Sequence, residues 1–218
     1  MELLAQFIDI VLHVDKYLAL LLAQYGQWIY AILFVIVFCE TGLVVTPFLP
    51  GDSLLFVAGA LAATSGGSFD IGIVIAVLLS AAVLGDNTNY WIGRWAGKRI
   101  LAWGETSRFF NRKAFDVTHA YYETHGGKTM LVARFMPFVR TFAPFVAGVA
   151  NMGYPRYFVF DFCGAVLWVL SLCLAGYWFG NLAWVKANLS LIIFATIGLS
   201  LAPLAVAWLR QRLATKAS

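Results

Sequence analysis

The chain has 218 residues, of which 61% are hydrophobic and only 12% are charged. A typical soluble domain carries about 25% charged residues, so this composition argues against a soluble enzyme and indicates a protein whose solvent is the lipid bilayer. The formal net charge is +4. Its placement along the chain matters more than its size, because Lys and Arg gather in the cytoplasmic loops of membrane proteins.

The three cysteines and the N-terminus exclude several further features. No basic segment or small-residue cleavage pattern follows Met1, so we expect no removable signal peptide. Cys39, Cys163 and Cys173 all lie in apolar runs, without a CxxC pair or a histidine at zinc-ligand spacing. We therefore expect no disulfide, no metal site and no cofactor, and a single membrane domain over residues 1–218.

The first element is an N-terminal helix within residues 1–27. Its polar residues share one narrow stripe at helical spacing, so one side of the helix is wet or faces protein. A helix of this kind either spans the membrane or lies in the interface, and the sequence leaves both open.

Residues 28–63 are apolar over too great a length for one spanning helix. As a single helix they would measure ~54 Å, against a hydrocarbon thickness of ~30 Å. Pro47, Pro50 and Gly51 interrupt the run, because two prolines and a glycine prevent a continuous helical hydrogen-bond ladder. We predict a re-entrant hairpin followed by a spanning helix over about 71–93, so that residues 28–93 form one unit.

Residues 94–128 are polar and hold seven of the fifteen Lys and Arg residues, which predicts a cytoplasmic loop. A short helix is expected within the loop, over about 112–125. The next apolar stretch begins at residue 129 and contains Pro137 and Pro144, which predict breaks in a second hairpin. With a span near 157–180, this gives a second unit over residues 129–180.

A last span near 188–209 and a basic tail make up residues 185–218. If residues 129–150 crossed the membrane completely, the tail residues Arg210, Arg212 and Lys216 would lie outside the cell. A second hairpin that enters and leaves on the cytoplasmic side places them inside, in agreement with the positive-inside rule. The prediction is therefore about four spanning helices, two hairpins and both termini in the cytoplasm.

Two tetrapeptides recur in the same order. The sequence Phe-Val-Ala-Gly occurs at 56–59 and 145–148, and Tyr-Trp-x-Gly occurs at 90–93 and 177–180. The alternative is that aromatic residues and glycines merely gather at the ends of spans. A true duplication with the predicted topology would be an inverted repeat of broken segments, which is typical of transporters that bind substrate where the breaks meet. The predicted fold class is thus an all-α polytopic membrane protein with two re-entrant hairpins in an inverted repeat.

Two acidic residues of the first hairpin are candidates for proton coupling. Glu40 lies too deep in its apolar segment to reach headgroup water, and burial favours the neutral form of a carboxyl group, so it can carry a proton. The alternative is a protonated glutamic acid that is only hydrogen-bonded inside the bundle. Asp52 follows Pro50-Gly51, where a helix N-cap is expected, and capping explains it as well as proton coupling does.

Two arginines flank Pro137 in the second hairpin. Arg134 and Arg140 can form paired hydrogen bonds with a phosphate beside the exposed backbone donors of a broken helix. For Arg134 the alternative is a side chain that extends to the cytoplasmic interface. A shared alternative for both arginines is structural pairing with Glu40 and Asp52, which would also bring the two hairpins into contact.

Other polar residues rank lower. Asp86 and Asp161 are interpreted as salt-bridge partners of Arg94 or Arg156. The sequence has no Ser-His-Asp order, phosphate-binding loop or zinc-protease motif, so we expect no enzymatic activity.

The hairpin motifs resemble those of the bacterial DedA family of inner-membrane proteins, and the resemblance covers nearly the whole chain. It implies dependence on the proton-motive force, a role in envelope integrity, and transport of undecaprenyl phosphate. It also implies that Glu40, Asp52, Arg134 and Arg140 are the functional positions, with Thr141 beside them at the phosphate. The resemblance rests on Phe38 to Leu54, His125 to Lys128, Ala133 to Pro137 and Arg140 to Pro144.

The leading hypothesis is a proton-coupled transporter that flips a polyprenyl phosphate or another anionic lipid across the inner membrane. The partners would then be this lipid, protons and the membrane, without nucleic acid, and the sequence leaves homo-oligomerisation open. A proton-coupled antiporter for a small ion or drug is a second hypothesis. The third is a non-transporting scaffold for envelope assembly, in which the four charges are only structural pairs.

Overall fold

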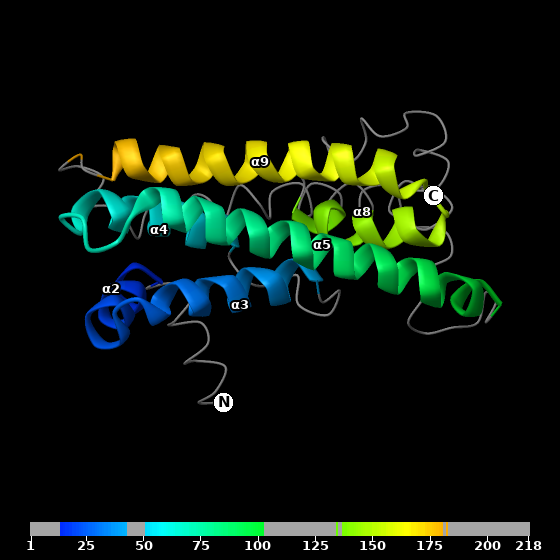
Figure 1. The fold of residues 1–218 in the computed structure, drawn as a ribbon, viewed down its shortest axis with the longest axis horizontal. Helices are drawn as coiled ribbons and strands as arrows, with labels where there is room; N and C mark the ends of the chain where they lie inside the picture. The colour runs from blue at the N-terminus through cyan, green and yellow to red at the C-terminus, as the bar shows by residue number, and fades with distance from the viewer. Residues whose placement is uncertain (1–13, 43–50, 103–133, 135–136, 181, 183–218) are drawn as a thin grey trace, which may run out of the picture.

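The computed structural model describes residues 14–42, 51–102, 134, 137–180 and 182. Within these ranges all regular structure is helical, in six helices, as the composition predicts. Figure 1 shows a bundle built along two long helices, α5 (Ile71–Ala102) and α9 (Tyr154–Phe179), which run in opposite directions. The short predicted helix at 112–125, the last span and the basic tail lie outside the described residues.

The two long helices are candidates for membrane spans by length and composition. Ile71–Ala96 and Tyr154–Phe179 are each apolar over 26 residues, which is about 39 Å of helix against a hydrocarbon thickness of ~30 Å. They correspond to the spans predicted at 71–93 and 157–180. α5 continues past residue 93 to Ala102, because no proline interrupts this stretch.

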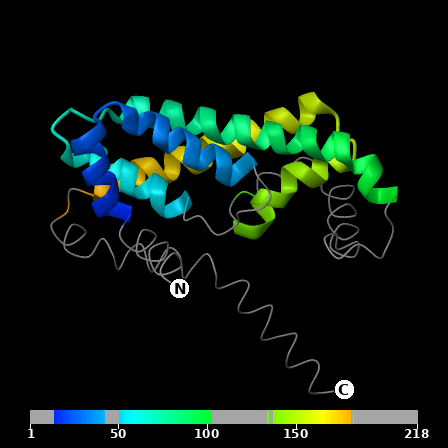
Figure 2. The same cartoon turned by 90° about the horizontal axis from the view of Figure 1, so that it is seen from below.

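Three shorter helices precede α5: α2 (Val14–Tyr25), α3 (Trp28–Gly42) and α4 (Gly51–Thr64). Gly26 has φ 54°, a conformation that glycine adopts at little cost, and there the chain leaves α2 and turns into α3. Figures 1 and 2 show that α3 and α4 run in opposite directions along one half of α5. Helices of 15 and 14 residues are too short to cross ~30 Å of hydrocarbon.

The predicted breaks are only partly in the described residues. Pro47 and Pro50 lie outside them, whereas Gly51 begins α4 and Pro137 begins α8 (Pro137–Val149). The prediction that Pro144 breaks the second hairpin is wrong, because Pro144 lies inside α8. A proline there removes one backbone hydrogen bond, and a helix packed inside a membrane bundle tolerates that loss.

The end of α8 is closed by a left-handed residue. Asn151 has φ 54°, and Asn is the residue that most often replaces glycine in this conformation. The amide of Met152 bonds to the Ala147 carbonyl at 3.0 Å and that of Asn151 to the Gly148 carbonyl at 3.0 Å, so the last carbonyls of the helix are paired. The chain can therefore reverse within a few residues and enter α9, which begins at Tyr154.

The short and long helices pack reciprocally. α4 packs on α9, and α8 packs on α5, along opposite halves of the bundle (Figure 1). At the first contact, Gly59 lies against the Cys173 backbone and Gly176 against the Phe56 backbone. At the second, Gly148 lies against the Tyr90 backbone and Gly93 against the Phe145 backbone. Small residues permit this close approach of helices, as is common in membrane bundles.

These contacts change the register of the predicted repeat. The glycines of the two Phe-Val-Ala-Gly segments, Gly59 and Gly148, have equivalent positions against the long helices. The Tyr-Trp-x-Gly segments do not match in the same way, because the counterpart of Gly93 is Gly176 and not Gly180. The difference is four residues, or about one helical turn, which leaves the same helix face in contact.

The apolar core is divided into two clusters. The larger one lies among α2, α3, α4, α5 and α9, and the smaller one is built around Tyr90, Ala147 and Tyr157. On α5, the buried polar residues Asp86 and Asn89 fall between Ala82 of the larger cluster and Tyr90 of the smaller. A polar layer therefore crosses the bundle near its middle.

Candidate functional site

The polar layer contains four carboxyl groups and two guanidinium groups from segments far apart in the chain. An ionised group is expensive to bury without a partner, so each of these six side chains needs an opposite charge nearby. They are Glu40 on α3, Asp52 on α4, Asp86 on α5, Asp161 on α9, Arg134, and Arg140 on α8.

Arg140 joins the two segments that were predicted to be hairpins. Its Nη2 donates to Glu40 Oε1 at 2.7 Å, and its Nη1 donates to Asp52 Oδ1. Asp52 lies in the first turn of α4, where a negative charge also faces the positive end of the helix dipole. The predicted proton-coupling residues and one predicted phosphate-binding residue are therefore in direct contact.

Glycine backbones make room for this contact. A side chain at Gly51 would collide with the Glu40 carboxyl group, so Gly51 serves packing as well as the start of α4. One turn of α3 is drawn close to α5, because a side chain at Gly42 would lie only 3.2 Å from the Gly85 Cα. This crossing positions Glu40, which is 3% exposed, beside the second segment.

Arg134 is held by a second pair of acids. Its Nη1 donates to Asp86 and also to Asp161 Oδ1, the latter at 3.1 Å. The alternative of an interfacial Arg134 is wrong, because this residue is only 5% exposed. Asp161 and Asp86 come from the two long helices, so Arg134 connects α5 to α9.

The sequence interpretation of Asp86 and Asp161 as partners of Arg94 or Arg156 is therefore wrong. Arg94 instead donates to the Tyr90 hydroxyl at 2.8 Å and to the Met152 carbonyl at 3.3 Å, nearer the end of the bundle. Glu40 was selected because it lies deep in an apolar segment. The same criterion applies to Asp86, which lies far from both ends of its apolar span. Applied to α5, this criterion identifies Asp86 as a site residue.

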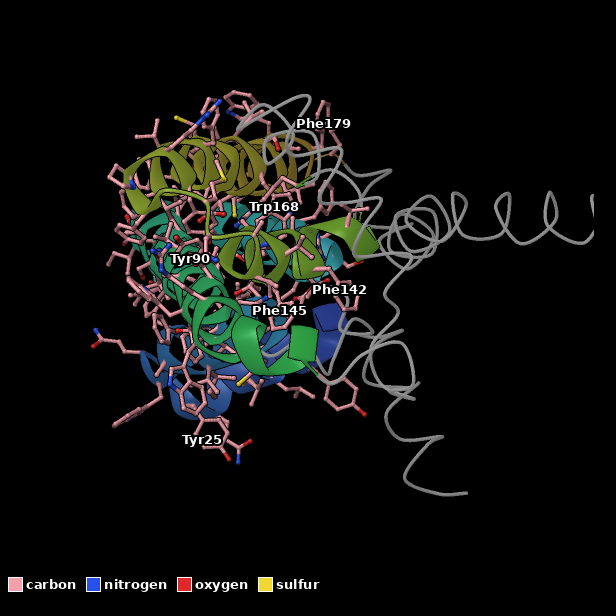
Figure 3. All side chains as sticks on the ribbon, turned by 90° about the vertical axis from the view of Figure 1, so that its right-hand side faces the viewer. Tyr25, Tyr90, Phe142, Phe145, Trp168 and Phe179 are labelled. Carbon is pink, nitrogen blue, oxygen red and sulfur yellow. The ribbon has the colours of Figure 1, made fainter. Side chains whose placement is uncertain are left out.

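Trp168 was not identified from the sequence, and its ring is close to both arginines. Its ring centre is 4.9 Å from the guanidinium carbon of Arg140 and 5.3 Å from that of Arg134. Its Nε1–H donates to Asp52 at 2.8 Å. Figure 3 shows Trp168 in the interior, between the ribbons of α9 and α8. Its position in the middle of a span was an available signal, since membrane tryptophans usually collect at the interfaces.

Asn89 ties the two short segments to α5. Its side-chain amide donates to the Thr141 carbonyl at 2.7 Å and to the Thr41 carbonyl at 3.3 Å. Asn89 is completely buried, and it links α3 to α8 across α5. Thr141, predicted from the family resemblance to lie at the phosphate, is buried beside Arg140 and is positioned by this bond.

The charged groups surround a very small cavity. Its volume of ≈ 10 Å³ is near the minimum that a single water molecule requires, so the site is closed to a phosphate group in this conformation. Paired arginine N–H donors suit a phosphate group. A phosphate that enters the site must compete with the carboxylates for these donors. The lining residues are Glu40, Thr41, Asp86, Arg134, Arg140, Thr141 and Trp168.

Comparison with known proteins places the chain in a family. The model of the VTT domain matches residues 49–178. The protein DedA of Escherichia coli (strain K12) is 50% identical over 212 residues, which cover 97% of this chain and 96% of that protein. An uncharacterized membrane protein of Mycobacterium leprae is 45% identical over 175 residues, or 80% of this chain and 77% of the relative.

A more distant relative has the same membrane character. The inner membrane protein YqjA of Escherichia coli (strain K12) is 36% identical over 156 residues, or 70% of this chain and 68% of that protein. No solved structure matches the chain. With the domain match, the relatives and the two apolar helices long enough to cross a bilayer, this chain belongs to the DedA family of VTT-domain membrane proteins.

Proposed function

We propose that this protein is a transporter, and not an enzyme, that flips a polyprenyl phosphate such as undecaprenyl phosphate across the inner membrane and is driven by protons. The observation that carries the proposal is the pairing of Arg140 with both Glu40 and Asp52 in the buried middle of the bundle. The two carboxyl groups can bind protons, and the guanidinium can bind a phosphate. Its lipid product would support envelope synthesis and integrity.

The proposed coupling is a competition for Arg140. Its N–H groups are occupied by two carboxylates, and a phosphate headgroup would need the same donors. A proton on Glu40 or Asp52 removes the negative charge that holds the arginine, so protonation favours loading of the phosphate. Loss of the proton on the other side restores the carboxylate pair and expels the lipid, while the isoprenoid tail stays in the bilayer.

An inverted repeat with two re-entrant hairpins would give the headgroup access from both sides. The support is the reciprocal packing of α4 on α9 and of α8 on α5, together with α3 and α4 too short to span. In inverted-repeat transporters the site lies between the repeats, and a rocking motion exposes it to each side in turn. The closed cavity of ≈ 10 Å³ would then belong to an occluded state.

The orientation proposed for the membrane places both termini in the cytoplasm. In that case the turn before α5 faces the periplasm and the turn between α8 and α9 faces the cytoplasm. Ser68 and Gly153 are exposed in these two turns, so cysteines at the two positions report the orientation. After replacement of Cys39, Cys163 and Cys173, an impermeant thiol reagent in spheroplasts should label Ser68→Cys and spare Gly153→Cys. The reverse pattern would refute the orientation.

The function is tested in proteoliposomes with matched amounts of inserted wild type, Arg134→Lys and Arg140→Lys. Lysine keeps the charge but loses the planar pair of donors, so flipping of a polyprenyl phosphate should fall by an order of magnitude or more. Flipping of the neutral polyprenyl alcohol should not depend on either arginine. If both lysine variants move the phosphate lipid at the wild-type rate, bidentate recognition is wrong.

A further inference from the structure

The competition described above is between Arg140, Glu40 and Asp52, and a separate group of charges surrounds Arg134. Asp86 and Asp161 both accept from Nη1 of Arg134. All three residues are nearly inaccessible, with 5% of Arg134 and 2% of each aspartate exposed. They come from α5, from α9 and from the segment just before α8, so any change in how these elements pack alters this group.

The charges of this group do not balance when all three side chains are ionised. Two carboxylates and one guanidinium leave one negative charge in a region closed to bulk water. A net buried charge is costly, and one proton on the pair of carboxyl groups removes it.

Unpaired atoms point to the same conclusion. Within the described part of the chain, Asp161 Oδ2 is buried without a hydrogen-bond partner, as is Glu40 Oε2 in the other group. Each group thus has one carboxyl oxygen to which a proton can add without breaking an ion pair. The Nε and Nη2 atoms of Arg134 are also buried and unpartnered, although they form the edge of the guanidinium that best binds a planar pair of oxygens.

Among the residues that the structure describes, the other cation acting on Asp86 is Arg140. Arg140 already donates to Glu40 and Asp52. The Tyr157 side chain also faces Arg134. The Trp168 ring is close to both arginines, and the small cavity is lined by Asp86, Glu40, Arg134 and Arg140. Each pair of acids therefore has its own guanidinium, although both groups border the same small cavity.

We propose that Asp86 and Asp161 form, around Arg134, a second proton-binding site that holds one proton independently of Glu40 and Asp52. The proton is shared between the two carboxyl groups, and Arg134 balances the carboxylate that remains. Its use in coupling rests on the proposed function, and in that role each transport cycle carries two protons, one at each arginine. Proton binding itself does not depend on transport.

Infrared spectroscopy of the purified protein at neutral pH tests proton binding directly. Protonated carboxyl groups have a carbonyl band that is separate from the amide bands and shifts in D₂O. Asp86→Asn and Asp161→Asn should each lose the same contribution to this band, because either change leaves a neutral pair of one carboxylate and Arg134. Glu40→Gln should lose a different contribution and keep this one. An unchanged band in both asparagine variants overturns the proposal.

Stability gives an independent readout. Each single variant should unfold at a temperature close to that of the wild type, whereas Asp86→Asn/Asp161→Asn leaves Arg134 without a counter-ion and should unfold far lower. A purely structural ion pair would instead make both single variants unstable. The control is Asp70→Asn, because Asp70 is exposed and only caps the amide of Ile73 at 2.9 Å. It should change neither the band nor the unfolding temperature.

The proton-to-lipid ratio in proteoliposomes separates this inference from the proposed function. Asp161→Asn should lower the ratio by one proton per lipid. If the infrared loss occurs but no variant, including the wild type, moves the lipid, the second site stands and the proposed function fails. If the wild type moves the lipid and neither asparagine variant changes the band, the function stands and the second site is wrong.

Discussion

Arg140 and Trp168 are in contact through the face of the indole ring, with 4.9 Å between the guanidinium carbon and the ring centre. The same indole donates its N–H to Asp52, which also accepts from Arg140. The three groups therefore hold one another in a buried site where a cation over an aromatic ring can contribute about 2 kcal/mol.

The first prediction separates the ring of Trp168 from its N–H group. Trp168→Phe keeps an aromatic face but loses the hydrogen bond to Asp52, which should cost about 1.5–3 kcal/mol of unfolding free energy. Trp168→Leu loses both and should be less stable and less active. Thermal unfolding in detergent and lipid flipping measure the two effects. Trp178→Phe is the matched control on the same helix, because Trp178 is 68% exposed. A Trp168→Phe protein equal to the wild type would exclude the hydrogen bond as a functional contact.

The second prediction concerns pH. In the proposed mechanism, protonation of Glu40 releases Arg140, so flipping should rise as the pH falls on the loading side. Glu40→Gln cannot exchange a proton, and its flipping rate should depend more weakly on pH than that of the wild type. Asp52→Asn distinguishes the two roles of Asp52. If transport by Asp52→Asn keeps the full pH dependence, Asp52 acts only at the start of α4. If transport by Glu40→Gln keeps it, Glu40 is not the proton carrier.

The third prediction concerns the bridge made by Asn89. Asn89→Ala leaves the Thr41 and Thr141 carbonyls without this donor in a buried region, which should lower the unfolding free energy by about 1–3 kcal/mol. Transport should fall as well, because α3 and α8 lose their link through α5. Asn87→Ala is the control, since Asn87 donates to Val83 of its own helix at 2.7 Å. Equal losses of unfolding free energy and transport in the two variants would show that the bridge contributes no more than a hydrogen bond within one helix.

The fourth prediction concerns the close helix contacts. A Cβ atom at Gly59 would lie 2.9 Å from the carbonyl carbon of Cys173, and one at Gly148 would lie 2.8 Å from the Arg94 nitrogen. Both neighbours are backbone, so Gly59→Ala and Gly148→Ala should each cost about 1–3 kcal/mol through overpacking. Gly153→Ala should be neutral in thermal unfolding, because Gly153 has φ −58° and no atom within 4 Å of a new Cβ. Stable alanine variants at the first two positions would contradict the tight packing.

The sequence by itself determined the solvent, the two long helices and part of the site. The few charged residues and the long apolar runs indicate a membrane protein, because ionised groups are too costly in hydrocarbon to be frequent there. The same cost singled out Glu40 and Arg140, since a charge deep in an apolar run needs a partner. The boundary at residue 28 was also predictable, and α3 begins at Trp28, two residues after the left-handed Gly26.

Only the tertiary structure decided which charges meet. Local sequence patterns report neighbours about one helical turn apart, whereas Arg134, Asp86 and Asp161 come from three separate segments. Their pairing depends on which helix faces touch, and this depends on the glycine contacts that draw α4 to α9 and α8 to α5. For the same reason the role of Trp168 was not identified, because its position in mid-span can be read from the sequence but its contact with two arginines cannot. Pro144 was misjudged because the surrounding bundle, and not the proline alone, decides whether a helix continues.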